Sequence, residues 1–282
     1  MPELPEVETI RRDLLQRLCG IGVHSLWASG KPLRLLHPIP EYALKLACVG
    51  ARIRDVRRKA KYLLIDFEQP KGWFVVIVHL GMTGRLRIDS STSLLWPHTH
   101  VLWRLENGLE LRYVDARRFG WIEVVKQAQL QSVVSLHKLG VDPLQPDFTP
   151  DFLFDAVRGR KTNIKALLFD QTIVAGLGNI YICEALHQAR LDPRMAAHRM
   201  TRLETIRLHD AIVDVLECAL DFGGTTLRDY MNTSGQTGQY QKHLHVYNQA
   251  GRLCKRQDGG IIRRIVQQSR STFFCPRCQK RR

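Results

Sequence analysis

The sequence lacks a long hydrophobic run, a secretory start and a cysteine framework. Its longest apolar run, Trp73 to Leu80, is far shorter than the roughly 20 residues that a membrane span needs. The first residues are not basic and then apolar, as a secretory signal would be. Seven cysteines are an odd number, and a Cys-x-x-Cys pair occurs only at Cys275 and Cys278. We therefore expect a protein of the reducing cytoplasm, without structural disulfides.

Acidic side chains are also scarce. The chain has 27 Asp and Glu against 42 Lys and Arg, a formal net charge of +15 over 282 residues. Hydrophobic residues make up 44 %, which is enough for packed cores and excludes a disordered chain. A folded chain with a pI near 9.8 favours a polyanionic partner, nucleic acid ahead of a membrane surface. A basic protein associated with RNA or ribosomes is the plain alternative.

The apolar pattern changes along the chain and predicts an α+β protein of more than one domain. A helix is expected from Pro5 to Leu18, because its apolar residues recur on one face. Short apolar runs between about 45 and 125, separated by turn residues, predict an antiparallel sandwich or barrel. Helical periodicity follows from 149 to 222, and the last forty residues predict a hairpin module. The expected domains are a β-sandwich with flanking helices at 1–140, a linker at 141–150, a helical domain at 151–240 and a finger hairpin at 241–282.

The chain begins Met1-Pro2-Glu3, which places a reactive amine beside a carboxyl group. A small second residue favours removal of Met1, and Pro2 would then carry a free secondary amine. An α-amine has a pKa near 7.7–8.0, so a useful fraction is unprotonated at neutral pH. Attack of such an amine on a sugar C1′ forms an iminium, and Glu3 can move a proton to or from the opening sugar. The alternative is that Pro-Glu merely opens a helix.

Five sequence blocks together closely resemble the bacterial formamidopyrimidine-DNA glycosylases. They occur in the family's order and span essentially the whole chain. The resemblance implies a β-sandwich domain, a helix–two-turn–helix domain and a zinc-finger hairpin. It also implies an enzyme that excises oxidised purines, such as 8-oxoguanine and formamidopyrimidines, and then cuts the strand by β,δ-elimination. The blocks are Met1–Thr9, His79–Leu86, Tyr113–Gly120, Val174–Tyr181 and Arg270–Gln279.

The resemblance assigns four catalytic residues. Pro2 is implied as the nucleophile and Glu3 as the proton donor that helps open the ribose. Lys61 matches the lysine of the β-elimination step; without the family, Arg57 to Lys61 would be an ordinary basic strand edge. Arg270 matches the arginine that grips phosphates at the lesion and assists δ-elimination.

Three more residues match the family's intercalating set. An enzyme that attacks C1′ in a duplex must extrude the nucleotide, which costs a few kcal/mol, and the hole must be filled. Met82, Arg117 and Phe119 match the residues that do so, and the arginine implies a preference for cytosine opposite the lesion. The alternative for Met82 and Phe119 is ordinary core packing.

A glycine-rich turn, Gly176 to Asn179, joins two helical segments and presents backbone amides at a helix start, where an anion is favoured. This resembles the family's helix–two-turn–helix element. Lys161 and Lys165 are expected four residues apart on one face of the preceding helix. The resemblance implies phosphate contacts by Asn179 and both lysines, and a further DNA contact by His98.

The finger departs from the family pattern, which usually has two Cys-x-x-Cys pairs. Cys275 and Cys278 form the second pair, but the first has only Cys254, with Gln257 at the next ligand position and Asp258 after it. Three thiolates leave a tetrahedral zinc site incomplete, and Asp258 can supply an oxygen ligand. We therefore expect one zinc ion on Cys254, Asp258, Cys275 and Cys278. The alternatives are His243 or His245 as a remote ligand, or a hairpin that folds without metal.

The favoured interpretation is a monomeric enzyme of the bacterial cytoplasm, used at the nucleoid, with damaged double-stranded DNA as partner and no membrane partner. One alternative is an endonuclease VIII-like enzyme for oxidised pyrimidines, against which Leu4 and the blocks around Met82 and Arg117 argue. Another is a catalytically inactive protein that binds damaged DNA. The altered finger supports that reading, whereas Pro2, Glu3 and Lys61 oppose it.

Overall fold

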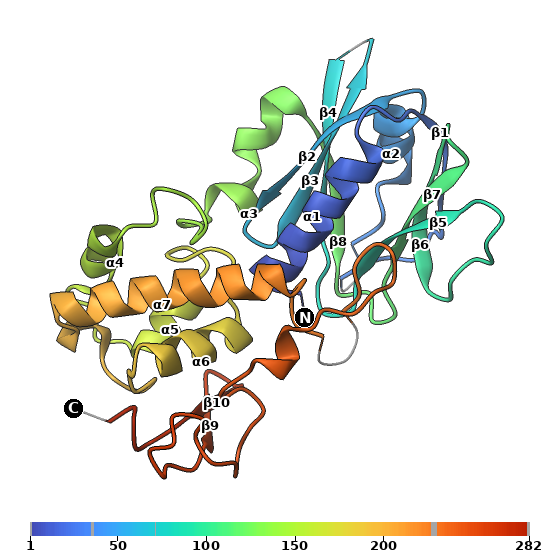
Figure 1. Ribbon diagram of the computed structural model, residues 1–282. Coiled ribbons are helices and arrows are strands. Elements are labelled where there is room, and N and C mark those ends of the chain that lie inside the picture. Colours follow the sequence, from blue (N-terminus) through green and yellow to red (C-terminus); the bar gives the residue numbers. More distant parts are fainter. Residues whose placement is uncertain (1, 35–36, 71, 227–229, 281–282) are drawn as a thin grey trace. The chain divides into compact units, whose positions relative to one another are not determined.

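The chain folds into two compact units in a computed structural model that describes residues 2–34, 37–70, 72–226 and 230–280. Unit 1 comprises Met1–His137 and Phe222–Gln239, and unit 2 comprises Lys138–Asp221 and Tyr240–Arg282. Figure 1 follows the chain by colour from blue to red. The segment Phe222–Gln239, which the sequence suggested was the end of the helical domain, therefore belongs to unit 1.

Unit 1 contains two antiparallel sheets of four strands each, in the orders β1-β6-β7-β5 and β2-β3-β4-β8 (Figure 1). A single hydrophobic cluster takes side chains from both sheets, among them Phe67 and the fully buried Trp103. This confirms the predicted sandwich. The strands are β1 (Val23–Ala28), β2 (Arg52–Lys59), β3 (Tyr62–Gln69), β4 (Gly72–His79), β5 (Arg85–Ser90), β6 (Thr99–Leu105), β7 (Leu109–Val114) and β8 (Trp121–Lys126).

Two helices cover the sandwich core. Helix α1 (Leu4–Leu18) contacts β2 and β3, and helix α2 (Glu41–Cys48) contacts β1 and β4. The buried positions of α1 recur at helical spacing, which explains why this segment folds as a helix against the sheet. They include Val7, Ile10, Leu14 and Leu18. Strand β8 leads into two short helices, η1 (Gln127–Ser132) and α3 (Val134–His137).

Strand β2 is built mainly from charged residues and forms one edge of its sheet. Its apolar side chains, Ile53 and Val56, are buried in the core. Two of the charges are paired across the contact with β3, where Arg57 bonds to Asp66 at 2.6 Å and Arg54 pairs with Glu68. Cross-strand pairs of opposite charge stabilise such a ladder.

The segment Phe222–Gln239 packs into unit 1 through backbone bonds and one core residue. The Ile88 N–H donates to the Thr233 carbonyl at 3.0 Å, so the segment lies along β5. Tyr230 is 7 % exposed and belongs to the hydrophobic cluster of the sandwich. The Thr225 N–H donates to the Glu6 carboxylate at 2.7 Å, which ties the segment to the start of α1.

Unit 2 is a group of helices followed by a hairpin. Helix α6 contacts α5, α7 and strand β10, so it lies at the centre of the unit. The two strands pair antiparallel, from Arg270 opposite Gln267 to Phe274 opposite Arg263. The α+β fold class with a helical domain and a hairpin module is thereby confirmed. The elements are α4 (Pro150–Val157), α5 (Ile164–Phe169), α6 (Asn179–Gln188), η2 (Ala197–Arg199), α7 (Arg202–Asp221), η3 (Tyr240–Lys242), β9 (Arg263–Gln267) and β10 (Arg270–Phe274).

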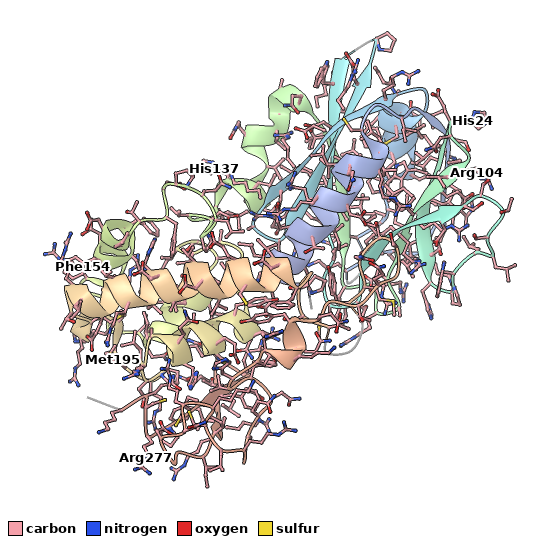
Figure 2. The ribbon with its side chains drawn as sticks, viewed as in Figure 1. His24, Arg104, His137, Phe154, Met195 and Arg277 are labelled. Carbon is pink, nitrogen blue, oxygen red and sulfur yellow. The ribbon has the colours of Figure 1, made fainter. Side chains whose placement is uncertain are left out.

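The side chains in Figure 2 show where each unit meets solvent. Both His24, on the edge strand β1, and Arg104, on the neighbouring strand β6, are exposed (Figure 2). Arg277 lies on the finger, beyond the hairpin (Figure 2). Within the described ranges, no helix combines the length and the apolar composition that crossing a membrane requires.

Candidate active site and nucleic-acid interface

The start of α1 holds Pro2 and Glu3 in a buried, doubly capped position. Pro2 is buried and Glu3 is 3 % exposed. The Glu3 N–H donates to Glu6 Oε2 at 2.8 Å, and the Glu3 carboxylate accepts from the Glu6 backbone N–H. This reciprocal arrangement is a capping box, here with glutamate at both positions. Glu6 Oε1 accepts from Thr225, so Glu6 fixes the backbone around Pro2 and Glu3 from two directions.

Lys61 lies in the tight turn between β2 and β3 and is 8 % exposed. Ala60, before it, has a left-handed φ of 53°. Arg58 bonds to Glu8 at 2.9 Å and donates to the Ala60 carbonyl at 3.2 Å. Helix α1 is thereby tied to the turn that carries Lys61. Burial raises the pKa of the Glu8 carboxyl, but hydrogen bonds from Arg11 and Arg58 prevail and lower it to about 2.

His79 lies beside Lys61 and stays neutral. Burial, followed by the positive charges of Lys61 and Arg34, lowers the pKa of His79 to about 4. Its Nδ1 accepts from the Gly81 N–H at 3.1 Å, which leaves Nε2 protonated. The imidazole therefore adds no positive charge near Lys61 at neutral pH.

Buried Asp115 organises the turn after β7 that carries Arg117 and Phe119. Asp115 is fully buried, and one of its oxygens accepts from Thr83 Oγ1 at 2.5 Å and from the Arg117 N–H at 3.3 Å. The Arg117 guanidinium lies 4.6 Å from the centre of the Phe119 ring. Phe119 is 38 % exposed and Met82 is half-buried, so Phe119 is not part of the core.

The turns that carry Met82 and Phe119 lie in direct contact. Gly81 has a φ of +62°, and a Cβ there would lie 2.4 Å from the Phe119 carbonyl carbon. No other residue allows this approach without moving backbone. The Asp115 N–H also donates to the carbonyl of exposed His98 at 3.0 Å. The predicted wedge residues and His98 are therefore presented by one connected group of turns in unit 1.

In unit 2, two side chains hold β10 beside the helices. Asn179, the first residue of α6, donates through Nδ2 to the Ser271 carbonyl at 2.8 Å. Lys165 is 1 % exposed, and its ammonium donates to Thr272 Oγ1 at 2.6 Å. These bonds fix the backbone directly after Arg270, whose guanidinium lies 5.9 Å from the centre of the Phe169 ring.

Lys161 and Lys165 do not lie together on an exposed face of one helix. The Asn163 side chain accepts from the Ala166 N–H at 2.8 Å and caps α5, which begins at Ile164. Lys161 therefore lies before the helix, where it is exposed. Lys165 lies inside the helix but is buried. The prediction that both lysines offer charge on one face was wrong, because Lys165 packs against β10; Lys161 stays a candidate phosphate contact.

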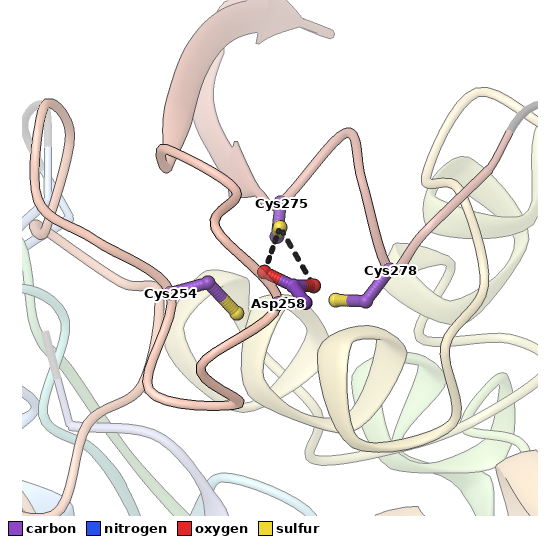
Figure 3. Close-up of side chains that lie close together, drawn as sticks. All are labelled: Cys254, Asp258, Cys275 and Cys278. Carbon is purple, nitrogen blue, oxygen red and sulfur yellow. Dashed lines mark hydrogen bonds between the residues drawn. The ribbon is translucent and has the colours of Figure 1, made fainter.

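The finger brings Cys254, Asp258, Cys275 and Cys278 together, as Figure 3 shows. One ligand atom from each lies within 4.8 Å of all the others. The Cys275 thiol donates to Asp258 at 3.6 Å, and Asp258 also accepts from the Gly260 N–H at 2.8 Å. Gln257, at the position of the missing cysteine, is exposed.

This donor set fits one zinc ion. Thiolates and a carboxylate are zinc ligands, and a tetrahedral ion with bonds near 2.3 Å separates its sulfurs by about 3.8 Å. Burial raises the pKa of Cys254 and of Cys278, and the neighbouring Cys275 adds to both shifts, whereas the Gly260 N–H lowers the pKa of Asp258. Zinc binding would release the thiol protons and replace the sulfur–carboxylate hydrogen bonds.

Three family models match this chain. The formamidopyrimidine-DNA glycosylase N-terminal domain matches residues 1–122, and the H2TH domain of the same enzymes matches 139–231. A zinc finger found in FPG and IleRS matches 259–281. The formamidopyrimidine-DNA glycosylase of Azorhizobium caulinodans is 43 % identical, covering 99 % of this chain and 100 % of the relative. That of Pelotomaculum thermopropionicum is 42 % identical over 99 % of both chains.

The chain belongs to the formamidopyrimidine-DNA glycosylase family.

Solved structures of the family agree. A Lactococcus lactis family member in complex with DNA containing an abasic site has a TM-score of 0.89 and 33 % identity, covering 99 % of this chain and 100 % of that one. A mutant from the same organism, bound to DNA containing Fapy-dG, has a TM-score of 0.90 and 33 % identity. The zinc-finger match begins at residue 259, after the altered first pair, so the family model leaves Cys254 and Asp258 outside its range.

Several supporting residues of this family site were missed by sequence reasoning. Glu184 on α6 is 3 % exposed and accepts the backbone N–H groups of His245, Val246 and Tyr247 at 2.8, 3.0 and 2.7 Å. This carboxylate holds the segment before the finger, although burial raises its pKa. A glutamate amid the apolar residues of a helix was the available signal. Glu8 and Arg58 carried no such signal, because acids and bases are common in a helix first turn and a basic strand.

Proposed function

We propose that this chain is a bifunctional glycosylase and lyase of base excision repair, acting on oxidised purines in duplex DNA. The observation that carries the proposal is the buried helix start that holds Pro2 and Glu3 and is tied through Glu8 and Arg58 to the turn of Lys61. Membership of the formamidopyrimidine-DNA glycosylase family supports the same chemistry. The substrates are 8-oxoguanine and formamidopyrimidines.

The chemistry begins when Met1 has been removed and the Pro2 nitrogen is free. That nitrogen attacks C1′ of the damaged nucleotide, the bond from C1′ to the base breaks, and the base leaves with a proton. Glu3 protonates the ring oxygen as the sugar opens, which leaves a cationic iminium between Pro2 and C1′. The iminium acidifies the C2′ proton, so successive eliminations break the C3′–O and C5′–O bonds. Water then hydrolyses the iminium and frees Pro2.

Each remaining site residue has a role suited to its place. Lys61 exchanges protons at the sugar during β-elimination. Met82 and Phe119 fill the space that the extruded nucleotide leaves, and Arg117 bonds to the orphaned base, which favours cytosine there. His98, Lys161, Asn179 and Arg270 bind phosphates, and Arg270 also assists δ-elimination; Lys165 positions β10 instead. The protein acts as a monomer on bacterial chromosomal DNA in the cytoplasm.

The finger holds zinc through Cys254, Asp258, Cys275 and Cys278. Bound zinc supplies cross-linking of the finger rather than a reactive group, because all four positions are taken by protein. The chain's own residues then present Arg270: Lys165 and Asn179 fix the two residues that follow it. Loss of the metal would weaken DNA binding ahead of the chemistry.

Borohydride trapping tests the proposal. The protein is incubated with a duplex carrying 8-oxoguanine opposite cytosine, and borohydride reduces the iminium to a stable covalent adduct. Pro2→Gln removes the secondary amine and, with its larger second residue, retains Met1. We expect the native protein to form the adduct, and Pro2→Gln to form none while still binding a duplex that carries a non-cleavable abasic analogue.

The outcomes separate the alternatives. No adduct from folded native protein that binds the lesion would establish an inactive damage-binding protein. An adduct only with an oxidised pyrimidine would establish the endonuclease VIII-like activity. Parallel loss of binding and trapping in Pro2→Gln would assign Pro2 a structural role.

A further inference from the structure

Unit 1 contains a basic cleft of which the proposed function uses only His98. The cleft has a volume of about 670 Å³. It lies where the end of β1 meets the start of β6 and the turn after β7. Its lining includes Trp27, Ser29, Lys31, His98, His100 and Arg118.

The lining of the cleft combines positive charge with one exposed aromatic ring. Lys31, His98 and Arg118 are exposed, and no acidic side chain is among the described residues that line it. Trp27, on the edge strand β1, is 43 % exposed. Proteins that bind nucleic-acid strands combine the same two features. Positively charged side chains bind the phosphates, and an aromatic face packs on the sugar or base. The Trp indole N–H is also a donor for a phosphate oxygen.

The walls of the cleft are fixed by hydrogen bonds. His100 Nε2 donates to the Asp115 carbonyl at 3.0 Å, and its Nδ1 accepts from Ser29 Oγ at 3.1 Å. Burial lowers the pKa of His100, in keeping with this neutral tautomer. Arg118 donates to the Pro32 carbonyl at 3.3 Å, and the Lys31 N–H donates to Ser29 Oγ at 3.2 Å. The cations are therefore presented on an ordered frame.

The backbone at His98 and at Arg118 is strained. His98 has a φ of 65° and Arg118 a φ of 54°, in the left-handed region that residues with a side chain disfavour. The Asp115 N–H, bonded to the His98 carbonyl at 3.0 Å, and the Arg118 N–H, bonded to the Asp115 carbonyl at 3.3 Å, hold both in place. The same Asp115 positions Arg117, so the cleft and the predicted wedge share one support.

We propose that this cleft binds the sugar–phosphate backbone of DNA flanking the lesion, with Lys31 and Arg118 on phosphates and Trp27 against the strand. The proposal rests on the proposed function, because it extends the DNA path past His98. It adds a contact by Trp27 and Lys31 that makes affinity depend on the length of one flank.

The test is a series of duplexes with a tetrahydrofuran abasic analogue, in which either flank is shortened one base pair at a time. A parallel series replaces each flank by a single strand. Binding is measured by fluorescence anisotropy for the native protein, Trp27→Ala and Lys31→Ala. The matched controls are Trp73→Ala, at a tryptophan 46 % exposed on β4, and Lys45→Ala, at an exposed lysine on α2.

We expect the native protein and both controls to lose affinity at one step of the series. Trp27→Ala and Lys31→Ala should bind the long duplex about tenfold more weakly and show a smaller step there. Lys31→Ala should also reduce the salt slope of binding by about 1. A step with duplex flanks identifies the duplex backbone, and a step only with single-stranded flanks identifies an unpaired strand; both support the cleft.

The proposal is overturned if the two variants follow the native protein at every length. It is equally overturned if they lose the same affinity on the shortest duplex, since that result reflects a change in folding or in the lesion site. Borohydride trapping of the native protein separates the proposed function from the proposed role of the cleft. Failure to trap refutes the proposed function, whereas trapping without a flank effect refutes only DNA binding by the cleft.

Discussion

Removal of the Glu8 charge should loosen the support beneath the reactive N-terminus. Glu8 is 7 % exposed and lies between three arginines, Arg11, Arg12 and Arg58. Glu8→Gln keeps the shape of the side chain and one carbonyl oxygen but removes the negative charge. Arg58, whose side chain is 4 % exposed, would then be buried without its carboxylate partner.

The size of the effect follows from the pKa. Burial raises the carboxyl pKa of Glu8, and the arginines lower it by more. The net result in the folded protein is a pKa that falls from 4.5 to about 2. A shift of this size corresponds to about 3 kcal/mol of stability near pH 7. Because the folded pKa is depressed, this stability is fully present above pH 4.5 and is lost as the pH falls to about 2. Since glutamine retains one acceptor, we expect Glu8→Gln to cost about 2 to 3 kcal/mol at neutral pH.

Tryptophan fluorescence isolates this effect from unit 2. All the tryptophans of the chain fall in unit 1, at positions 27, 73, 96, 103 and 121. Urea unfolding of the native protein and Glu8→Gln, measured at pH 7 and at steps down to pH 3, gives the free energy of unfolding of unit 1. The two curves should converge as the pH falls, because only the native protein has this charge to lose.

The matched control is Glu41→Gln on α2. Glu41 pairs with Lys45 at 2.7 Å, but the two side chains are 39 % and 50 % exposed, so the loss should stay below about 0.5 kcal/mol. Glu8→Gln should also slow borohydride trapping, because the tie between α1 and the turn of Lys61 is weakened. A Glu8→Gln protein as stable as Glu41→Gln, with a parallel pH curve, would refute the reasoning.

Two further predictions concern the finger. Asp258→Ala should reduce bound zinc, measured by metal analysis of the purified protein, and Gln257→Ala should not, because the Asp258 carboxylate and not residue 257 lies in the cluster; equal metal content in both would remove Asp258 from the ligand set. Arg270→Ala should weaken binding to lesion DNA and lower the salt slope by about 1, with exposed Arg252 of the finger as the control position. An unchanged slope in Arg270→Ala would contradict its phosphate contact.

The apolar strands and the amphipathic helices were predictable from the sequence, whereas strand β2 was harder to predict. Strands such as β4, Gly72–His79, carry continuous apolar residues that only a buried position explains. Strand β2 has six charged residues out of eight, and only Ile53 and Val56 mark its buried side. Its partners, Asp66 and Glu68 on β3, are nine and fourteen positions beyond Arg57 and Arg54. Local pattern does not reveal such pairing.

The candidate site shows the same division. Pro2, Glu3, Lys61 and the finger cysteines stand in recognisable local motifs, so the sequence pointed to them before the structure was known. The exposure of Lys165 could not be predicted, because it depends on Thr272, 107 residues away. The cluster of Asp258 with Cys275 likewise depends on how the hairpin closes, and a count of cysteines alone leaves the fourth position open.

The return of Phe222–Gln239 to unit 1 sets the order in which the protein can be completed during synthesis. Tyr230 belongs to the sandwich core and Thr225 bonds to Glu6, so the sandwich is unfinished when residue 137 leaves the ribosome. The remaining stretch from residue 137 to residue 239 takes about 5 to 20 s at ordinary elongation rates. During that interval the nascent sandwich lacks part of its core, and the start of α1 lacks the Thr225 bond.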